Sequence, residues 1–227
     1  MVESTITLTR QVFDRGQRPK TRGWFHFWAS IGALVSGTVL TTYGWMTLPW
    51  WQAFGVLIYA VGTVVLFGVS AAYHLGRWQK SKTVAMWRRA DHSTIALFIA
   101  CTYTPLCLIV LSPVQAAIML AIAWIGAIAG MSLNLAWIDH PRWLDLVVYL
   151  TLGWLIVPLL PQLWTSAGPA VVWLLIAGGI VYSLGALVYG FKWPGRNAKY
   201  VGFHEHFHMA TIAAAVVHQV AVWLVVA

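Results

Sequence analysis

Histidine, serine and aspartate recur at short spacings in a chain that has few charged side chains. His204 and His208 are four residues apart. On a helix, positions i and i+4 lie on one face, where two imidazoles can bind one metal ion. His74 would supply a third nitrogen from a separate segment. Three protein ligands and an open fourth position form the arrangement of a catalytic zinc site.

Two further residues could work beside such an ion. Asp91 is the natural partner, because a carboxylate can accept a hydrogen bond from the metal's water or orient a ligating histidine. Ser70 lies one turn before His74 and shares its helix face, so its hydroxyl can donate or accept nearby. We therefore predict a zinc site with His74, His204 and His208 as ligands and with Asp91 and Ser70 as catalytic residues. Iron or another divalent ion also accepts imidazole ligands.

The segment His204-Glu205-His206-Phe207-His208 also matches H-E-x-x-H, the zinc metalloprotease motif, in which the glutamate is a general base. Against this role, Glu205 is rotated by ~100° from His204 on a helix. An acid in the first turn of a helix complements the helix dipole, and this is the preferred interpretation. Asp145, near the start of another predicted helix, is interpreted in the same way.

The remaining histidines are less defined. His206 is expected to face away from the 204/208 side, and His140 is expected to be solvated in a loop. His26, His92 and His218 are candidates for polar neighbours of the site. His218 lies ~15 Å further along its helix than His208, which is too far to bind the same ion.

The elements that must position these residues are membrane-spanning helices. Hydrophobic residues make up 60% of the chain and charged residues 9%, whereas a soluble domain carries about 25% charged residues. A spanning helix needs ~20 apolar residues, so the uncharged stretches 23–76, 92–138 and 146–191 each hold two spans and 206–227 holds one. The predicted spans are 24–46, 51–74, 88–111, 114–134, 143–161, 169–190 and 204–227. The fold class is therefore an all-α, polytopic membrane protein, a seven-transmembrane-helix bundle over residues 23–227.

Residues 1–22 form a predicted cytoplasmic tail, which is too polar for a cleaved signal peptide. All fourteen Lys and Arg residues lie in four segments: 1–22, 77–89, 142 and 192–199. These are the tail and every second loop or helix mouth, so the positive-inside rule places the N-terminus in the cytoplasm and the C-terminus outside. The net charge of +8 is then a topology signal, and no nucleic-acid partner is expected. The predicted location is the inner or plasma membrane, with the zinc site near the cytoplasmic face.

Small and aromatic residues fit this bundle. Many tryptophans stand near predicted span ends, as in the aromatic belts of membrane proteins. Gly126-x-x-x-Gly130 and the glycines between 178 and 190 favour close helix packing inside the bundle, with homodimerisation as a second use. Cys101 and Cys107 lie in one span and are interpreted as reduced packing residues.

Several separated motifs resemble the hemolysin III family, the bacterial branch of the progestin and adipoQ receptor (PAQR) superfamily, which is related more widely to alkaline ceramidases. The motifs are Ser70-Ala71-Ala72-Tyr73-His74, Asp91-His92, Thr102-Tyr103-Thr104-Pro105, Gly178-Gly179-x-x-Tyr182-x-x-Gly185, Trp193-Pro194 and Gly202-Phe203-His204-Glu205-x-Phe207-His208. The resemblance covers nearly all of residues 23–227. It implies a cytoplasmic-side zinc held by His74, His204 and His208, with Asp91 contacting the zinc water and Ser70 as the motif serine. Related receptor sequences have Gln at the position of Glu205, which weakens the case for an essential base.

Three functions are consistent with these observations. The first is a zinc-dependent hydrolase of a lipid amide or ester, with membrane lipids as partners and a substrate acyl chain among the apolar helices. The second is a non-enzymatic receptor or membrane-state sensor, in which zinc joins the second and seventh helices. The third is a pore-forming cytolysin, which the family name suggests. A bis-histidine haem protein is a distant fourth.

Overall fold

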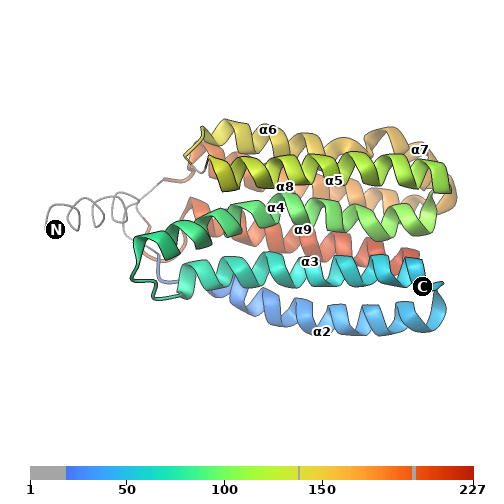
Figure 1. The fold of residues 1–227 in the computed structure, drawn as a ribbon, viewed down its shortest axis with the longest axis horizontal. Coiled ribbons are helices and arrows are strands. Elements are labelled where there is room, and N and C mark those ends of the chain that lie inside the picture. Colours follow the sequence, from blue (N-terminus) through green and yellow to red (C-terminus); the bar gives the residue numbers. More distant parts are fainter. Residues whose placement is uncertain (1–18, 138, 196–197) are drawn as a thin grey trace, which may run out of the picture.

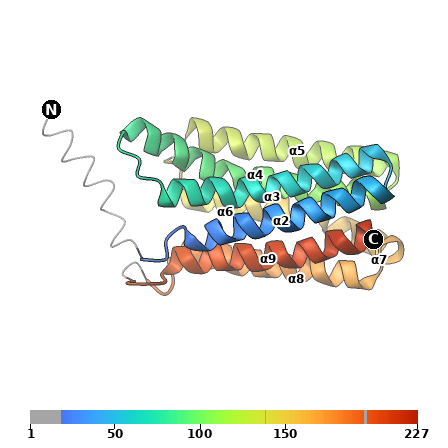
Figure 2. The same ribbon diagram turned by 90° about the horizontal axis from the view of Figure 1, so that it is seen from below.

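The computed structural model describes residues 19–137, 139–195 and 198–227, and no strand occurs among them. The helices run side by side along one long axis (Figures 1 and 2). They are α2 (Trp24–Thr47), α3 (Trp50–Leu75), α4 (Ser81–Val110), α5 (Pro113–Ala136), α6 (Arg142–Gly153), the 3-10 helix η1 (Trp154–Leu159), α7 (Leu160–Ser166), α8 (Pro169–Phe191) and α9 (Phe203–Val226). The predicted tail lies outside the described residues except for positions 19–22.

Among the described residues, six helical segments are long and apolar enough to cross a membrane, and one of them, Arg142–Ser166, is formed by α6, η1 and α7 together. The chain is thus an all-α, multi-pass membrane protein. The predicted first span corresponds to α2, which has 24 residues but does not reach the same hydropathy. Its sequence contains four threonines, two serines and three glycines, which lower its apolar character. It nevertheless packs along α3 and α9 like a full member of the bundle.

Proline and serine residues set the helix ends. Pro113 begins α5, where Ser112 and Gln115 form a capping box. Pro169 begins α8 directly after Gly168. Pro158 lies in η1, where its missing N–H interrupts the α-helical hydrogen bonds and leaves a 3-10 segment inside the fifth span.

The helix that carries the third predicted span is longer than the span. The predicted span is 88–111, and α4 begins at Ser81. A helix can continue beyond the hydrocarbon with charged side chains on it. As a result Arg88 and Arg89 lie within α4, with two turns of helix before them.

The centre of the bundle is α4. It packs against α3, α5, α6 and α9, and 67% of its apolar window is buried, compared with 28% for α5. The predicted packing role of the glycines is confirmed at several contacts: a Cβ on Gly185 would lie 2.6 Å from the Cβ of Ala210, and one on Gly178 would overlap the ring of His218. Cys101 and Cys107 are free and buried, as predicted.

The two ends of the bundle differ in charge. The beginning of α2 and the C-terminus lie at opposite ends (Figure 1). The end that holds the beginning of α2 also holds the α3–α4, α5–α6 and α8–α9 connections, and every described Lys and Arg residue lies there. We refer to it as the basic end. Lys20 and Thr21 fasten the chain to the α8–α9 connection, because the Lys20 N–H donates to the Lys199 carbonyl (3.1 Å) and the Thr21 hydroxyl donates to the Tyr200 carbonyl (2.6 Å).

Candidate metal centre

The three predicted ligands meet at the basic end. One ring nitrogen from each of His74, His204 and His208 lies within 4.8 Å of the others. The His74 and His204 Nε2 atoms are 3.1 Å apart, close to the ~3.3 Å that two nitrogens on one tetrahedral zinc would show at Zn–N distances of about 2.0–2.1 Å. His74 and His208 are buried and His204 is half-buried. This cluster could hold a metal ion, and its donor set fits zinc.

His74 lies in the last turn of α3 and packs against the start of α2. Gly23 precedes α2 with a φ of 86°, a left-handed conformation that suits glycine. A Cβ on Gly23 would lie only 2.8 Å from the Cβ of His74. Glycine therefore satisfies both the backbone conformation and the close approach that this junction requires.

The start of α9 is fixed by Glu205. One carboxylate oxygen of Glu205 accepts a hydrogen bond from the Gly202 N–H (2.9 Å), and the other pairs with Arg22. The Glu205 side chain is only 1% exposed. This supports the helix N-terminal interpretation over the general base, because both oxygens are already engaged in holding the first turn of α9 against the segment before α2.

Removing the Glu205 side chain should destabilise the protein. Breaking a buried ion pair by deleting one partner costs about 3–5 kcal/mol, so Glu205→Ala should lower the unfolding midpoint strongly in a detergent thermal melt. Glu205→Gln should lower it less, since the amide oxygen can still accept from Gly202. The exposed Arg77→Gln substitution serves as the control. Equal midpoints for Glu205→Ala and the wild type would contradict this role.

The carboxylate predicted beside the metal is in place. Asp91 lies on α4, and its Oδ2 is 3.7 Å from His74 Nε2. Its side chain is 12% exposed, and it lines the same cavity as His204 and His208. Ser70, one turn before His74, is buried and also lines this cavity. Asp91 and Ser70 thus lie beside the histidine cluster, while their catalytic roles stay predictions.

His26 is the closest additional histidine. Its ring stacks on that of His208, with centroids 3.8 Å apart and an interplanar angle of 5°. It is 3% exposed, so it is a polar neighbour of the cluster as expected. His206 faces elsewhere, because its Nδ1 contacts the Gly202 carbonyl at 2.7 Å. His218 lies deeper along α9, with its Nε2 3.2 Å from the Leu175 carbonyl.

A largely apolar cavity extends from the cluster into the bundle. It has a volume of about 160 Å³, roughly ten times the room that one water molecule needs. Its lining comes from α2, α3, α4, the α6–α7 span, α8 and α9, and along α9 it runs from His204 to His218. The apolar walls include Ile95, Phe98 and Leu175. The charged residues of the lining, Asp91, Arg142 and Asp145, lie at the end with the histidine cluster.

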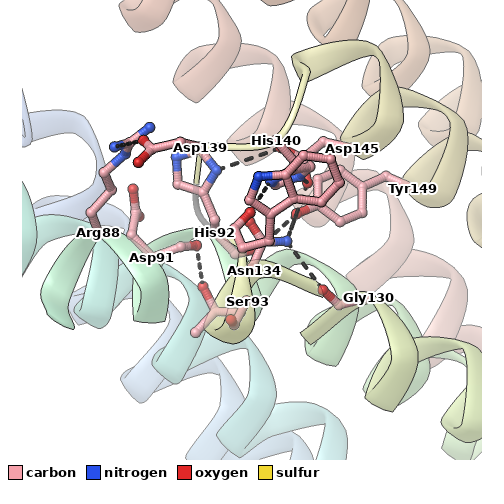
Figure 3. Close-up of polar contacts among 12 residues, drawn as sticks. Arg88, Asp91, His92, Ser93, Gly130, Asn134, Asp139, His140, Asp145 and Tyr149 are labelled. Atoms are coloured by element: carbon pink, nitrogen blue, oxygen red, sulfur yellow. Dashed lines mark hydrogen bonds and ion pairs between the residues drawn. The ribbon is translucent and has the colours of Figure 1, made fainter. Parts of the chain in front are cut away.

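A second cluster of polar side chains, centred on Asp145, lies at the same end of the bundle (Figure 3). The Asp145 carboxylate is 2.9 Å from His140 Nε2 and accepts a hydrogen bond from Asn134 (3.1 Å). His140 is buried, so the expectation that it is solvated was wrong. A position in a loop does not imply exposure here, because the short α5–α6 connection folds its ring under the first turn of α6. Asp145 does lie in that first turn, as interpreted, but it also organises this group.

Comparisons with known proteins agree with this architecture. A profile described as "Haemolysin-III related" matches residues 15–219. The chain is 32% identical over 142 residues to "Hemolysin-3 homolog" of Bacillus subtilis (63% of this chain, 66% of the relative) and 33% identical over 132 residues to "Hemolysin-3" of Bacillus cereus (58% and 59%). The chain thus spans less than two thirds of these two relatives.

A third relative is human "Monocyte to macrophage differentiation factor", 30% identical over 178 residues, or 76% of this chain and 71% of the relative. The region that the profile matches contains α2 to α8 and most of α9, and with them the histidine cluster. On this match, the chain belongs to the haemolysin-III-related family of membrane proteins.

Proposed function

We propose that the chain is a zinc-dependent membrane hydrolase of a lipid amide or ester. One observation carries the proposal: three clustered imidazoles and the Asp91 carboxylate stand at one end of an apolar cavity inside a membrane bundle. Zinc bound by His74, His204 and His208 would supply Lewis acidity for activating water and polarising a carbonyl.

The chain's own residues then have defined tasks. Asp91 can take the proton of an attacking water, because its carboxylate lies beside His74 and lines the cavity. The Ser70 hydroxyl, one turn from His74, can orient the water or the substrate carbonyl. The apolar walls exclude bulk water and accommodate an acyl chain, with its polar linkage held near the cluster.

The location of the reaction follows from charge. All described basic residues are at the end that holds the cluster. The positive-inside rule therefore favours a site near the cytoplasmic face of the inner or plasma membrane, with the N-terminus inside and the C-terminus outside. Lipids of that leaflet could reach the cavity without leaving the bilayer.

Fatty-acid release tests the proposal. The purified protein, reconstituted with zinc into bilayers, is given a panel of lipid amides and esters, and released acid is measured. Turnover should require zinc and should fall to background with Asp91→Ala. The absence of zinc-dependent turnover on every lipid class would reject the proposal.

A receptor or membrane-state sensor with structural zinc is the second candidate. It is favoured by the origin of the ligands, since His74 ends α3 and His204 begins α9, so an ion would join two separate helices. The connections between the helices are also short. This candidate predicts a large loss of thermal stability for His74→Ala but unchanged stability and output for Asp91→Asn.

Cytolysis is the third candidate, and the names of the two Bacillus relatives favour it. Dye-loaded vesicles test it directly. Leakage that rises with the amount of reconstituted protein would support a pore, whereas vesicles that stay sealed at high protein load would remove this candidate.

A further inference from the structure

The second polar group at the cavity is built around a firmly held carboxylate. One oxygen of Asp145 contacts His140 Nε2 (2.9 Å) and the Asn134 side-chain amide (3.1 Å). His140 is fixed from its other side, because its Nδ1 lies 2.6 Å from the Trp137 carbonyl. Asn134 is fully buried and also donates to the Gly130 carbonyl and to the Tyr149 hydroxyl, each at 3.1 Å. The position of Asp145 is thus determined by α5, the α5–α6 connection and α6 (Figure 3).

The other oxygen of Asp145 faces His92. The distance from Asp145 Oδ2 to His92 Nδ1 is 3.8 Å, which is an ion-pair distance when the imidazole is protonated. The backbone of His92 is held as well, since the Tyr149 hydroxyl donates to its carbonyl at 3.0 Å. A carboxylate facing Nδ1 favours the proton on that nitrogen and leaves Nε2 as the nitrogen that exchanges protons.

The two histidines that contact Asp145 differ in access. The His92 side chain is 21% exposed and lines the cavity. The His140 side chain is 1% exposed and is not part of the cavity lining. Of the two, His92 is therefore the one that a bound molecule can reach.

His92 also has a useful position relative to the histidine cluster. It follows Asp91 in the sequence of α4, and Asp91 lies beside His74 of α3. The cavity end therefore has the histidine cluster on the side of α3 and α9 and the His92–Asp145 pair on the side of α4 and α6. A scissile bond placed between them would have the attacking water on one side and His92 on the other.

We propose that His92, positioned by Asp145, donates the proton that the leaving group needs; this inference rests on the proposed hydrolase function. The oxygen of water bonds to the carbonyl carbon, and its proton passes to Asp91. The carbon–nitrogen or carbon–oxygen bond breaks, its electron pair leaves on nitrogen or oxygen, and that atom takes the Nε2 proton of a doubly protonated His92 ring, which keeps its proton on Nδ1. Return of the Asp91 proton to His92 restores both groups, and one water is consumed. His92 is then a catalytic residue and Asp145 a positioning residue.

Two esters with the same acyl chain test the proposal, one with an alkyl alcohol as leaving group and one with 4-nitrophenol. An alkoxide needs a proton to leave, whereas 4-nitrophenolate leaves without one. General acid catalysis contributes about 10²–10⁴-fold, so His92→Gln should lower kcat on the alkyl ester by at least ~100-fold and leave the nitrophenyl ester nearly unchanged. Asp145→Asn should show the same selectivity with a smaller loss.

His140→Gln is the matched control, because it alters the same carboxylate but removes no imidazole from the cavity. It should lower thermal stability and affect both esters equally. Equal losses on both esters for His92→Gln would overturn the proposed proton donor while leaving the hydrolase intact. If the wild-type protein cleaves neither these esters nor any lipid amide, both proposals fail.

A measurement without metal or turnover tests the positioning. Nitrogen-15 NMR of labelled histidines in metal-free protein, with the His92 signals assigned by their loss in His92→Gln, should show the proton on Nδ1. Asp145→Asn should shift His92 toward the other tautomer. A wild-type His92 ring protonated only on Nε2 would overturn the inference.

Discussion

Replacing Asp91 with asparagine is expected to lower lipid hydrolysis by at least ~100-fold, because a positioned acid or base contributes about 10²–10⁴-fold to a proton-transfer step. Asparagine has nearly the same shape and can still accept a hydrogen bond, but it cannot take a proton. The fold should therefore persist, and at saturating zinc the metal content should stay near that of the wild type. Initial rates of fatty-acid release, with zinc content and the melting midpoint measured on the same samples, check this result.

Asp139→Asn is a suitable control for this experiment. Asp139 is an aspartate at the same end of the bundle, but its side chain is 79% exposed and pairs with Arg88 at 3.0 Å, outside the cavity. It should retain wild-type rates. If Asp91→Asn and Asp139→Asn behave alike, Asp91 takes no proton in the reaction and the sensor with structural zinc becomes the better account.

Replacing any one of His74, His204 and His208 with alanine is expected to abolish stable zinc binding. Two remaining imidazoles would leave two tetrahedral positions without protein ligands, and even the loss of an outer-shell partner costs 10–100-fold in metal affinity. Zinc per chain should fall from about one to below about a tenth after dialysis. The melting midpoint should fall as well, because ligands from α3 and α9 no longer share an ion.

His206→Ala is the matched control for the ligand series. It removes an imidazole from the same turn of α9, but this imidazole contacts the Gly202 carbonyl and not the other three rings. It should keep its zinc. Full zinc content in the His74, His204 and His208 variants, or equal loss in the His206 variant, would contradict the assignment of ligands.

The helices and the histidine cluster could be predicted from local sequence patterns. The uncharged stretches and their proline breaks indicate where helices lie, because hydrocarbon excludes charge and proline interrupts helical hydrogen bonds. The four-residue spacing of His204 and His208 predicts that they share one helix face. The depth of His74 relative to them follows once each span is assigned a direction, which is why the sequence predicts the cluster.

The group around Asp145 could not be predicted in this way. Its members come from α4, α5, the α5–α6 connection and α6, and no spacing rule relates His92 to Asp145 or Asn134 to Tyr149. Its arrangement depends on the rotation of each helix about its axis, which packing determines and hydropathy does not. His26 is similar: its stacking on His208 depends on how α2 lies across α9, and the sequence indicated only a general neighbourhood.

Zinc-edge X-ray absorption of the purified protein tests the central claim most directly, because it reports both the presence of the metal and its ligands. We expect about one zinc per chain, with three imidazole nitrogens at about 2.0–2.1 Å and one further light atom. The signal should vanish when His74, His204 and His208 are all replaced. A protein that takes up no zinc, or a spectrum that survives the triple replacement, would contradict the account.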